Sequence, residues 1–221
     1  KIITIPCLYA RSLIAVSIVL CMPHENAKLD TITSRFYGGS MKKEMLFQLD
    51  IVWQLFEYHC HNLSKKEAMW CKTPQGLQIR KTDDSWGADW PDTEVYTIGP
   101  PSIAWTMWHI MYWWKKVLSM SKDNKTIEKE DIIWPGSVDL AIDEIGRCHR
   151  DWIAFVESLS DEDLCSDKMC KWPFEGQSMY SLILWLNVEF MKNVSEIGSA
   201  RFLYAATEKQ PTSSLSFNCI N

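Results

Sequence analysis

Three polar residues interrupt an apolar helical repeat near the C-terminal end of the chain. In the stretch LNVEFMKNVSEIG, residues 186–198, Glu189, Asn193 and Glu196 stand at positions i, i+4 and i+7, on the stripe that a helix in a bundle buries. A buried carboxylate without a partner costs several kcal/mol. In helical bundles the usual partner is a metal ion held by facing helices or a closed hydrogen-bond network. The spacing therefore predicts a polar site inside a bundle.

His109 is the best candidate partner for these groups, because it is the only histidine in the strongly apolar segment of residues 100–120. An imidazole can bind a metal, pair with a carboxylate or exchange a proton with a substrate. We expect His109, Glu189 and Asn193 to converge in one cavity, with Glu196 near its rim. Two interpretations stay open: a metal bound by the first three side chains, or a hydrogen-bonded pair of His109 and Glu189 without a metal.

The other histidines are weaker candidates. His59 and His61 flank Cys60, which lies on an apolar repeat, so both rings are expected to point away from it and to be solvated at a helix end. His149 stands on another apolar repeat, where a core histidine with a satisfied hydrogen bond is more common than a site residue. The sequence contains no glycine-rich phosphate loop, serine-nucleophile elbow or H-E-x-x-H motif.

Four segments with helical apolar spacing would position these residues. The seam of the first steps alternately by three and four residues through Leu46, Leu49, Trp53, Phe56, Cys60 and Leu63. Helices are expected at about residues 43–62, 100–120, 138–159 and 178–207. Ser137 is the expected N-cap of the third helix, and SKKE at 64–67 matches a capping box. The sequence predicts an all-α four-helix bundle with a long loop, residues 71–100, between helices 1 and 2.

The two ends of the chain differ from this central region. Residues 1–40 contain the stretch RSLIAVSIVLCMP, in which a basic residue precedes an apolar run, and then the linker-like YGGSMKKE at 37–44, which leads into Met41. We interpret them as a non-core or non-native N-terminal extension; a weak export signal is the alternative, although no small-x-small cleavage pattern follows. The bundle would cover residues 41–208, and residues 209–221 are typical of a polar tail.

Composition limits the partners that the chain can have. The net charge of −5 and the pI near 5.6 come from interspersed acids and bases, which give no basic field for nucleic acid or an anionic membrane. The apolar run at residues 13–22 is shorter than the about 20 residues that span a bilayer. The eight cysteines form no C-x-x-C pair. We therefore expect a cytoplasmic protein with free thiols and with neither a nucleic-acid nor a membrane partner.

Several motifs resemble the DinB/YfiT-like family of four-helix-bundle proteins, over roughly residues 41–207. They are LSKKEAMWCKTP after the first helix, PSIAWTMWHI at the start of the second, SLSDEDL after the third and EIG at the end of EFMKNVSEIG. The first and third motifs also echo each other, as though two helix pairs were related. The resemblance implies a DinB-like bundle for the central region.

In that family a histidine on the second helix and an H-x-x-x-H pair on the fourth bind a divalent metal ion, and some members are thiol-dependent transferases or isomerases. The resemblance puts the first ligand at His109 and the pair at Glu189 and Asn193, so that both histidines of the fourth helix are replaced. A glutamate is a competent oxygen ligand, whereas an asparagine carbonyl suits magnesium, calcium or manganese better than zinc or nickel.

Two functions follow as alternatives. The first is a divergent DinB-like protein whose pocket between helices 2 and 4 takes a small-molecule ligand or a thiol, as in a metal- or thiol-dependent transferase. The second is a non-catalytic bundle whose polar seam specifies packing, and which serves as a binding or homodimerising module. A stabilising divalent cation would favour the first, because a ligand of the native state raises its stability.

Overall fold

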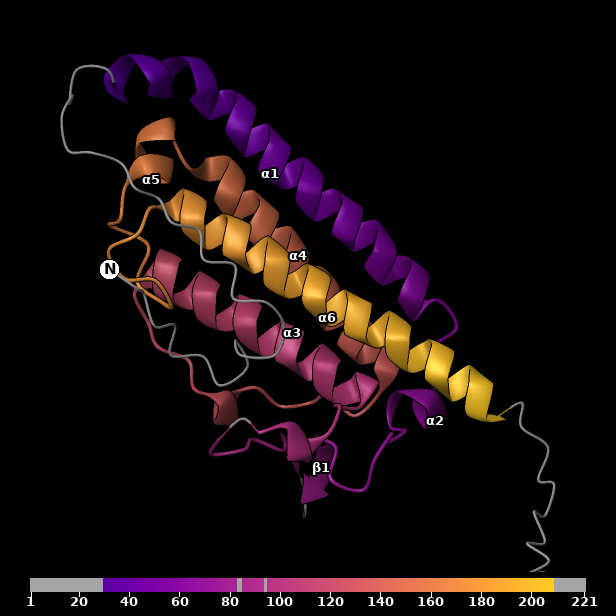
Figure 1. Cartoon of the computed structure of the whole chain (residues 1–221). Coiled ribbons are helices and arrows are strands. Elements are labelled where there is room, and N and C mark those ends of the chain that lie inside the picture. The colour runs from indigo at the N-terminus through magenta and orange to yellow at the C-terminus, as the bar shows by residue number, and fades with distance from the viewer. Residues whose placement is uncertain (1–29, 83–84, 94, 209–221) are drawn as a thin grey trace, which may run out of the picture.

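Four long helices dominate the fold. The computed structural model describes residues 30–82, 85–93 and 95–208, with side chains from Met41 onward. The long helices are α1 Asp30–Cys60, α3 Ile103–Leu118, α4 Val138–Ser158 and α6 Met179–Glu208 (Figure 1). A short helix follows α1 and another follows α4: α2 Lys65–Ala68 and α5 Asp161–Cys165. The predicted all-α four-helix bundle is confirmed. The suggested export signal and the polar tail lie outside the described residues.

Helices α1 and α6 lie side by side and run in the same direction (Figure 1). Asn187 of α6 donates from Nδ2 to the carbonyl oxygen of Met45 in α1 at 2.9 Å. Further along both helices, Arg201 donates from Nη1 to the carbonyl oxygen of His59 at 2.8 Å. These two contacts hold α1 and α6 in one fixed register.

Helices α3 and α4 run opposite to this pair. Successive contacts along α3 and α6 join His109 with Asn193, then Trp113 with Trp185. Successive contacts along α1 and α4 join Lys42 with Leu159, then Trp53 with His149. The connection from α3 to α4 therefore returns along the length of the bundle, and it includes the π-helical turn η2 Ser119–Asp123 and the 3-10 turn η3 Lys129–Asp131.

Serine caps start the helices where the sequence indicated them. Ser137 Oγ accepts from the backbone N–H of Leu140 at 3.2 Å and so begins α4, as predicted. Ser64 likewise caps α2 by accepting from the N–H of Glu67. The capping box predicted at 64–67 is only half right, because the Glu67 carboxylate pairs with Arg201 instead of turning back to the cap.

Two boundaries differ from the sequence prediction. Helix α1 begins at Asp30 rather than near residue 43, although two adjacent glycines at 38 and 39 disfavour a helix there. The segment 71–100 is not entirely loop, because it holds a two-stranded antiparallel hairpin, β1 Ile79–Thr82 and β2 Ser85–Ala88, and the 3-10 turn η1 Tyr96–Ile98. The strands were missed because neither shows an alternating apolar pattern.

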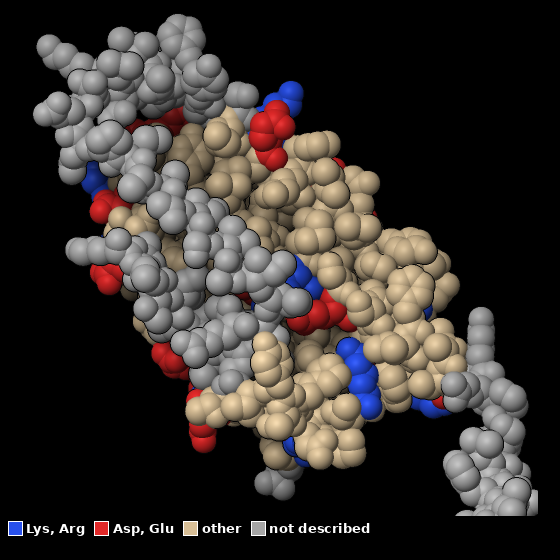
Figure 2. Space-filling view, in the orientation of Figure 1, with Lys and Arg blue, Asp and Glu red and all other residues tan. Residues whose placement is uncertain are grey.

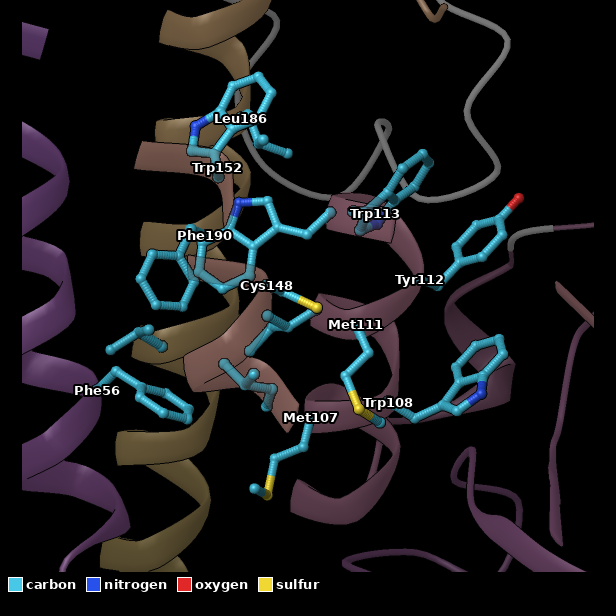
Figure 3. Close-up of a cluster of buried hydrophobic side chains, with 14 of the residues drawn as sticks. Phe56, Met107, Trp108, Met111, Tyr112, Trp113, Cys148, Trp152, Leu186 and Phe190 are labelled. Atoms are coloured by element: carbon cyan, nitrogen blue, oxygen red, sulfur yellow. The ribbon is translucent and has the colours of Figure 1, made fainter. Parts of the chain in front are cut away.

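Large aromatic side chains dominate the core. Figure 3 shows them converging from all four long helices, with Phe56 from α1, Trp113 from α3, Trp152 from α4 and Phe190 from α6. Six of the twelve tryptophans are buried. Two buried thiols belong to the same interior, and burial raises the pKa of both Cys60 and Cys148 to about 12.

The cysteines that the structure describes are free. No helix in the described ranges combines the length and the apolar character needed to cross a membrane.

Candidate functional site

His109 is fully buried on α3, with none of its surface exposed. Its ring stacks on Trp105, with centroids 4.8 Å apart and planes 18° apart. The ring of Trp113, one turn further along α3, meets it edge-on at 83°. The imidazole also faces α6, where it meets Asn193. A histidine in this position is a core residue, so each of its nitrogens needs a hydrogen-bond partner.

Both ring nitrogens of His109 are engaged by protein groups. Nδ1 lies 3.1 Å from Oδ1 of Asn193, and the Asn193 amide is held in that orientation because its Nδ2 donates to the carbonyl oxygen of Glu189 at 2.8 Å. The indole N–H of Trp113 points at Nε2 at 2.6 Å. The network therefore fixes a neutral imidazole that donates from Nδ1 and accepts at Nε2.

Burial keeps His109 neutral over the physiological range. Loss of solvation lowers its pKa to about 3, and the positive charge of Lys192 acts in the same direction, while the bond to Asn193 opposes them. A proton on the ring would also have to displace the indole N–H of Trp113. His109 thus has the chemistry of a structural histidine rather than of a general acid or base working near pH 7.

The carboxylate of Glu189 has its counter-ion on its own helix. Lys192 Nζ lies 2.7 Å from Glu189 Oε2, three residues along α6, and both side chains are largely buried. His109, for its part, contacts Asn193 on the same seam. Neighbouring red and blue atoms in the middle of the face in Figure 2 show charges of both signs close together over α6.

A small cavity lies between α3 and α6. Glu189 and Asn193 line its polar side, and Trp113, Trp114 and Phe190 line much of the rest. Its volume is about 10 Å³, which is room for one water molecule, whereas pockets for small ligands have about 300–1,000 Å³. This cavity is therefore far smaller than a pocket for a small ligand.

The remaining predicted site residue, Glu196, lies one turn beyond Asn193 and outside the lining of this cavity. Its negative charge acts on Lys72, which follows α2: burial lowers the pKa of Lys72, and Glu196 raises it. Glu189, Lys192 and Glu196 thus give the polar seam of α6 alternating charges, and Lys72 adds a positive charge that acts on Glu196. The seam is therefore electrically balanced within the protein.

The residues present do not fit a divalent metal ion in this arrangement. A metal at His109 needs a ring nitrogen with a free lone pair, yet Nε2 accepts the Trp113 N–H and Nδ1 faces the Asn193 oxygen. The Glu189 carboxylate is paired with Lys192. In the described part of the chain, no group of three or more histidine, cysteine, aspartate and glutamate side chains is placed to hold a metal.

A second polar cluster, which the sequence did not single out, joins α1, α2 and α6. Arg201 donates to both carboxylate oxygens of Glu67 and to the carbonyl oxygens of His59 and His61. The guanidinium therefore joins the C-terminal end of α1 to α2 through all three of its nitrogens. The only sequence signal was the glutamate of SKKE, which a capping box explained equally well.

His59 is half-buried, so the prediction of a solvated histidine is only partly right. Its ring lies against the backbone of α6 at Gly198, where an added Cβ would come within 2.7 Å of the imidazole. Burial, followed by the charge of Arg201, lowers the pKa of His59. The glycine of the EIG motif thus has a packing reason, because it makes room for this ring. An open groove of about 560 Å³ lies beside it, bounded in part by Tyr58 and Phe202.

His149 packs in the core away from His109. Its ring stacks on Trp53, with centroids 4.0 Å apart and planes 6° apart, and it also contacts Trp114. Burial lowers its pKa to about 4, with smaller opposing effects of Asp50 and Arg150. His149 therefore packs as a core residue and does not join the site around His109.

The two buried histidines, His109 and His149, predict acid-sensitive stability. Their folded-state pKa values of about 3 and about 4 lie below the unfolded value of 6.5, so between these limits the unfolded chain binds protons that the folded chain does not. The free energy of unfolding should therefore fall as the pH drops below 6.5, by up to about 1.4 kcal/mol per pH unit for each histidine. Urea unfolding at pH 7 and pH 5 measures this, and His149→Phe should flatten the dependence. Equal stability at both pH values would contradict the burial of these rings.

Comparison with curated proteins and with solved structures gives no match for the chain. Residues 48–197, however, match the family model of the DinB superfamily. The match spans all of α3 and α4, the C-terminal part of α1 and the part of α6 that carries the polar seam, which agrees with the resemblance in the sequence motifs. The chain belongs to the DinB superfamily.

Proposed function

We propose that this chain is a non-catalytic member of its superfamily, in which the polar seam between α3 and α6 holds the helices in register and the protein acts through its surface. The observation that carries this proposal is the engagement of both His109 nitrogens, one with Asn193 and one with Trp113. A histidine that binds a metal needs a ring nitrogen with a free lone pair, and neither nitrogen of His109 offers one in this arrangement.

Energetics support the same reading. A buried amide and a buried imidazole are costly unless each is paired, so the His109–Asn193 contact can form in only one alignment of the two helices. A polar pair in an apolar seam can thereby specify register, as a single buried asparagine does in coiled coils. The Glu189–Lys192 pair completes the balance of charge on the same seam.

A metal- or thiol-dependent transferase is the competing function. It would require Trp113 to withdraw from Nε2 of His109 and Lys192 to leave Glu189, and the cavity of about 10 Å³ would have to enlarge many-fold. The first two changes remove a hydrogen bond and an ion pair from the interior, and a ligand would have to replace both.

Divalent cations test the proposal directly. The melting temperature of the parent chain should not change when zinc, nickel or manganese is added, because no ligand set is assembled among residues 30–82, 85–93 and 95–208. The combined variant Glu189→His with Asn193→His supplies two imidazoles beside His109 and should gain a rise with zinc or nickel. Binding at a hundred times the dissociation constant adds about 2.7 kcal/mol of stability, which is readily measured.

The matched control is Glu189→Gln with Asn193→Gln, which disturbs the same two positions without adding imidazoles and should show no cation effect. A rise in the melting temperature of the parent chain that disappears in His109→Gln would overturn the non-catalytic proposal and favour a metal-dependent function.

A further inference from the structure

The outward faces of α1 and α6 carry exposed apolar side chains at helical spacing, here called the outer face. Its large members are Phe47, Ile51, Leu55 and Tyr58 of α1 and Leu184, Val188 and Phe202 of α6, which are 38–74% exposed. Figure 2 shows mostly tan atoms over this side of the molecule, with few charged groups. Single exposed apolar residues are ordinary, but a contiguous uncharged patch marks an interaction surface.

The register of the two helices sets which parts of the outer face lie level with each other. Asn187 with Met45, and Arg201 with His59, are both separated by 142 positions in the chain. Because α1 and α6 run in the same direction, Ser195 of α6 must lie level with position 53 of α1.

The exposed stripe of α6 is self-complementary about Ser195. Positions equally distant from Ser195 on its two sides combine a larger side chain with a smaller one: Met191 with Ser199, Phe202 with Val188, and Leu184 with Ala206. If two copies of α6 packed antiparallel with Ser195 at the centre, each bulky residue would meet a smaller one of the other copy. This alternation of large and small residues is what allows facing helices to approach closely.

The stripe of α1 has nearly the same centre. Ile51 and Leu55 stand two residues on either side of position 53, and Phe47 and Tyr58 stand six and five residues from it. Position 53 is level with Ser195, so one twofold axis lying in the outer face and crossing both helices would pair α6 with α6 and α1 with α1. The exposed stripes of two different helices therefore share one symmetry centre. Twofold packing of two copies requires such a shared centre, whereas binding of an unrelated partner does not.

We propose that the outer face is the interface of a homodimer in which α1 and α6 of two copies pack antiparallel about this axis. The inference rests on the proposed function, because a bundle without a reactive centre must act through its surface. The seven large side chains expose on the order of 700 Å² in each copy, at about 100 Å² apiece where aromatic rings bury 150–250 Å². That area approaches the about 800 Å² per partner of a standard interface, and an apolar stripe with charged neighbours such as Glu44 matches the apolar core and polar rim of an interface.

In this dimer the second copy would fill the open groove between α1 and α6. The groove is bounded by Tyr58 and Phe202. The pairing places Phe47 and Val188 of the partner subunit opposite these two residues. The aromatic side chain of the second copy would therefore enter the groove and cover the most exposed rings of the outer face.

Sedimentation velocity of the full chain over a range of concentrations, in the presence of EDTA, tests the dimer. The parent should sediment as a dimer, and Val188→Glu should shift it to monomer by burying an unpaired carboxylate in the interface. Leu140→Glu is the matched control, because Leu140 is an equally exposed apolar residue on α4, away from the outer face. It should leave the dimer intact.

Disulfide cross-linking tests the position of the axis. Ser195→Cys puts a thiol on the axis, where it meets its own symmetry mate and should form a covalent dimer on oxidation. Ser199→Cys shifts each thiol by four residues in opposite directions, which separates the pair by about 12 Å along the helices, so it should not cross-link. The native cysteines are common to both variants and cancel in the comparison.

A parent chain that is monomeric at every concentration would overturn the dimer. That result is expected if residues 1–29 cover the outer face of their own chain. A dimer that survives Val188→Glu, or that cross-links equally through both cysteines, would also overturn it, because the interface would lie elsewhere. Metal binding by the parent chain would defeat the proposed function alone, since EDTA removes the cation from the sedimentation experiment.

Discussion

Replacing His109 with alanine is expected to lower the free energy of unfolding by about 3–5 kcal/mol, the range for removal of a large, fully buried side chain. Two losses add together. The ring leaves a cavity beside Trp105, and the Asn193 carbonyl and the Trp113 indole N–H lose their buried partner. Urea denaturation at pH 7, with an unchanged dependence on urea concentration, measures the difference.

His61→Ala is the control for this change, since His61 is an exposed histidine and its loss should alter stability by no more than about 0.5 kcal/mol. A double-mutant cycle with Asn193→Ala isolates the His109–Asn193 bond. Because His109 is neutral, the coupling should be about 1 kcal/mol, as for an uncharged hydrogen bond. A coupling several times larger would mean that the ring is charged and that the neutral tautomer is wrong.

The second large effect is expected at Arg201. The variant Arg201→Met keeps the aliphatic stem but strands the Glu67 carboxylate, which is 8% exposed, and removes the Arg201 donor from two carbonyl groups, one in α1 and one just after it. Removing one partner of a buried ion pair costs about 3–5 kcal/mol. Thermal and urea unfolding of the variant should both show the loss.

Arg147→Met is the matched control, because Arg147 also pairs with a glutamate, Glu144, but its own side chain is 63% exposed. An exposed pair contributes about 0–1 kcal/mol, so this variant should unfold close to the parent. Adding Glu67→Leu to Arg201→Met should restore part of the lost stability by removing the stranded charge. If Arg201→Met were as harmless as Arg147→Met, the cluster would not hold the end of α1.

Helix positions were predictable because they depend on periodicity along the chain. The repeat that leads to Leu203 defines α6, and Ser137 marks the start of α4, so both helices were located to within about two residues. The start of α1 was predicted too late in the sequence, because two adjacent glycines were interpreted as part of a linker although the helix continues through them. The hairpin between residues 79 and 88 was missed because its strands are short and largely polar.

The contacts within the polar seam depend on side-chain conformation, which periodicity does not determine. Register alone puts His109 level with Asn193, and the two side chains are 3.1 Å apart. Sequence spacing could not show that Lys192 would turn inward to Glu189, because a lysine three residues along a helix is equally able to extend into solvent. Nor could sequence spacing show that the indole N–H of Trp113 would donate a hydrogen bond to Nε2 of His109. These choices follow from three-dimensional packing.

The parallel pairing of α1 with α6 also governs the order in which the chain can fold. The two helices meet through residues 142 positions apart, whereas Lys115 and Glu144, which join α3 to α4, are separated by only 29. Contacts between distant residues form slowly, since the intervening chain must first be ordered. The α3–α4 pair can therefore assemble early, and the docking of α1 on α6 closes the structure last. Interactions made in that final step, such as those of Arg201, act mainly by slowing unfolding, so the persistence of the native state depends on the last contacts to form.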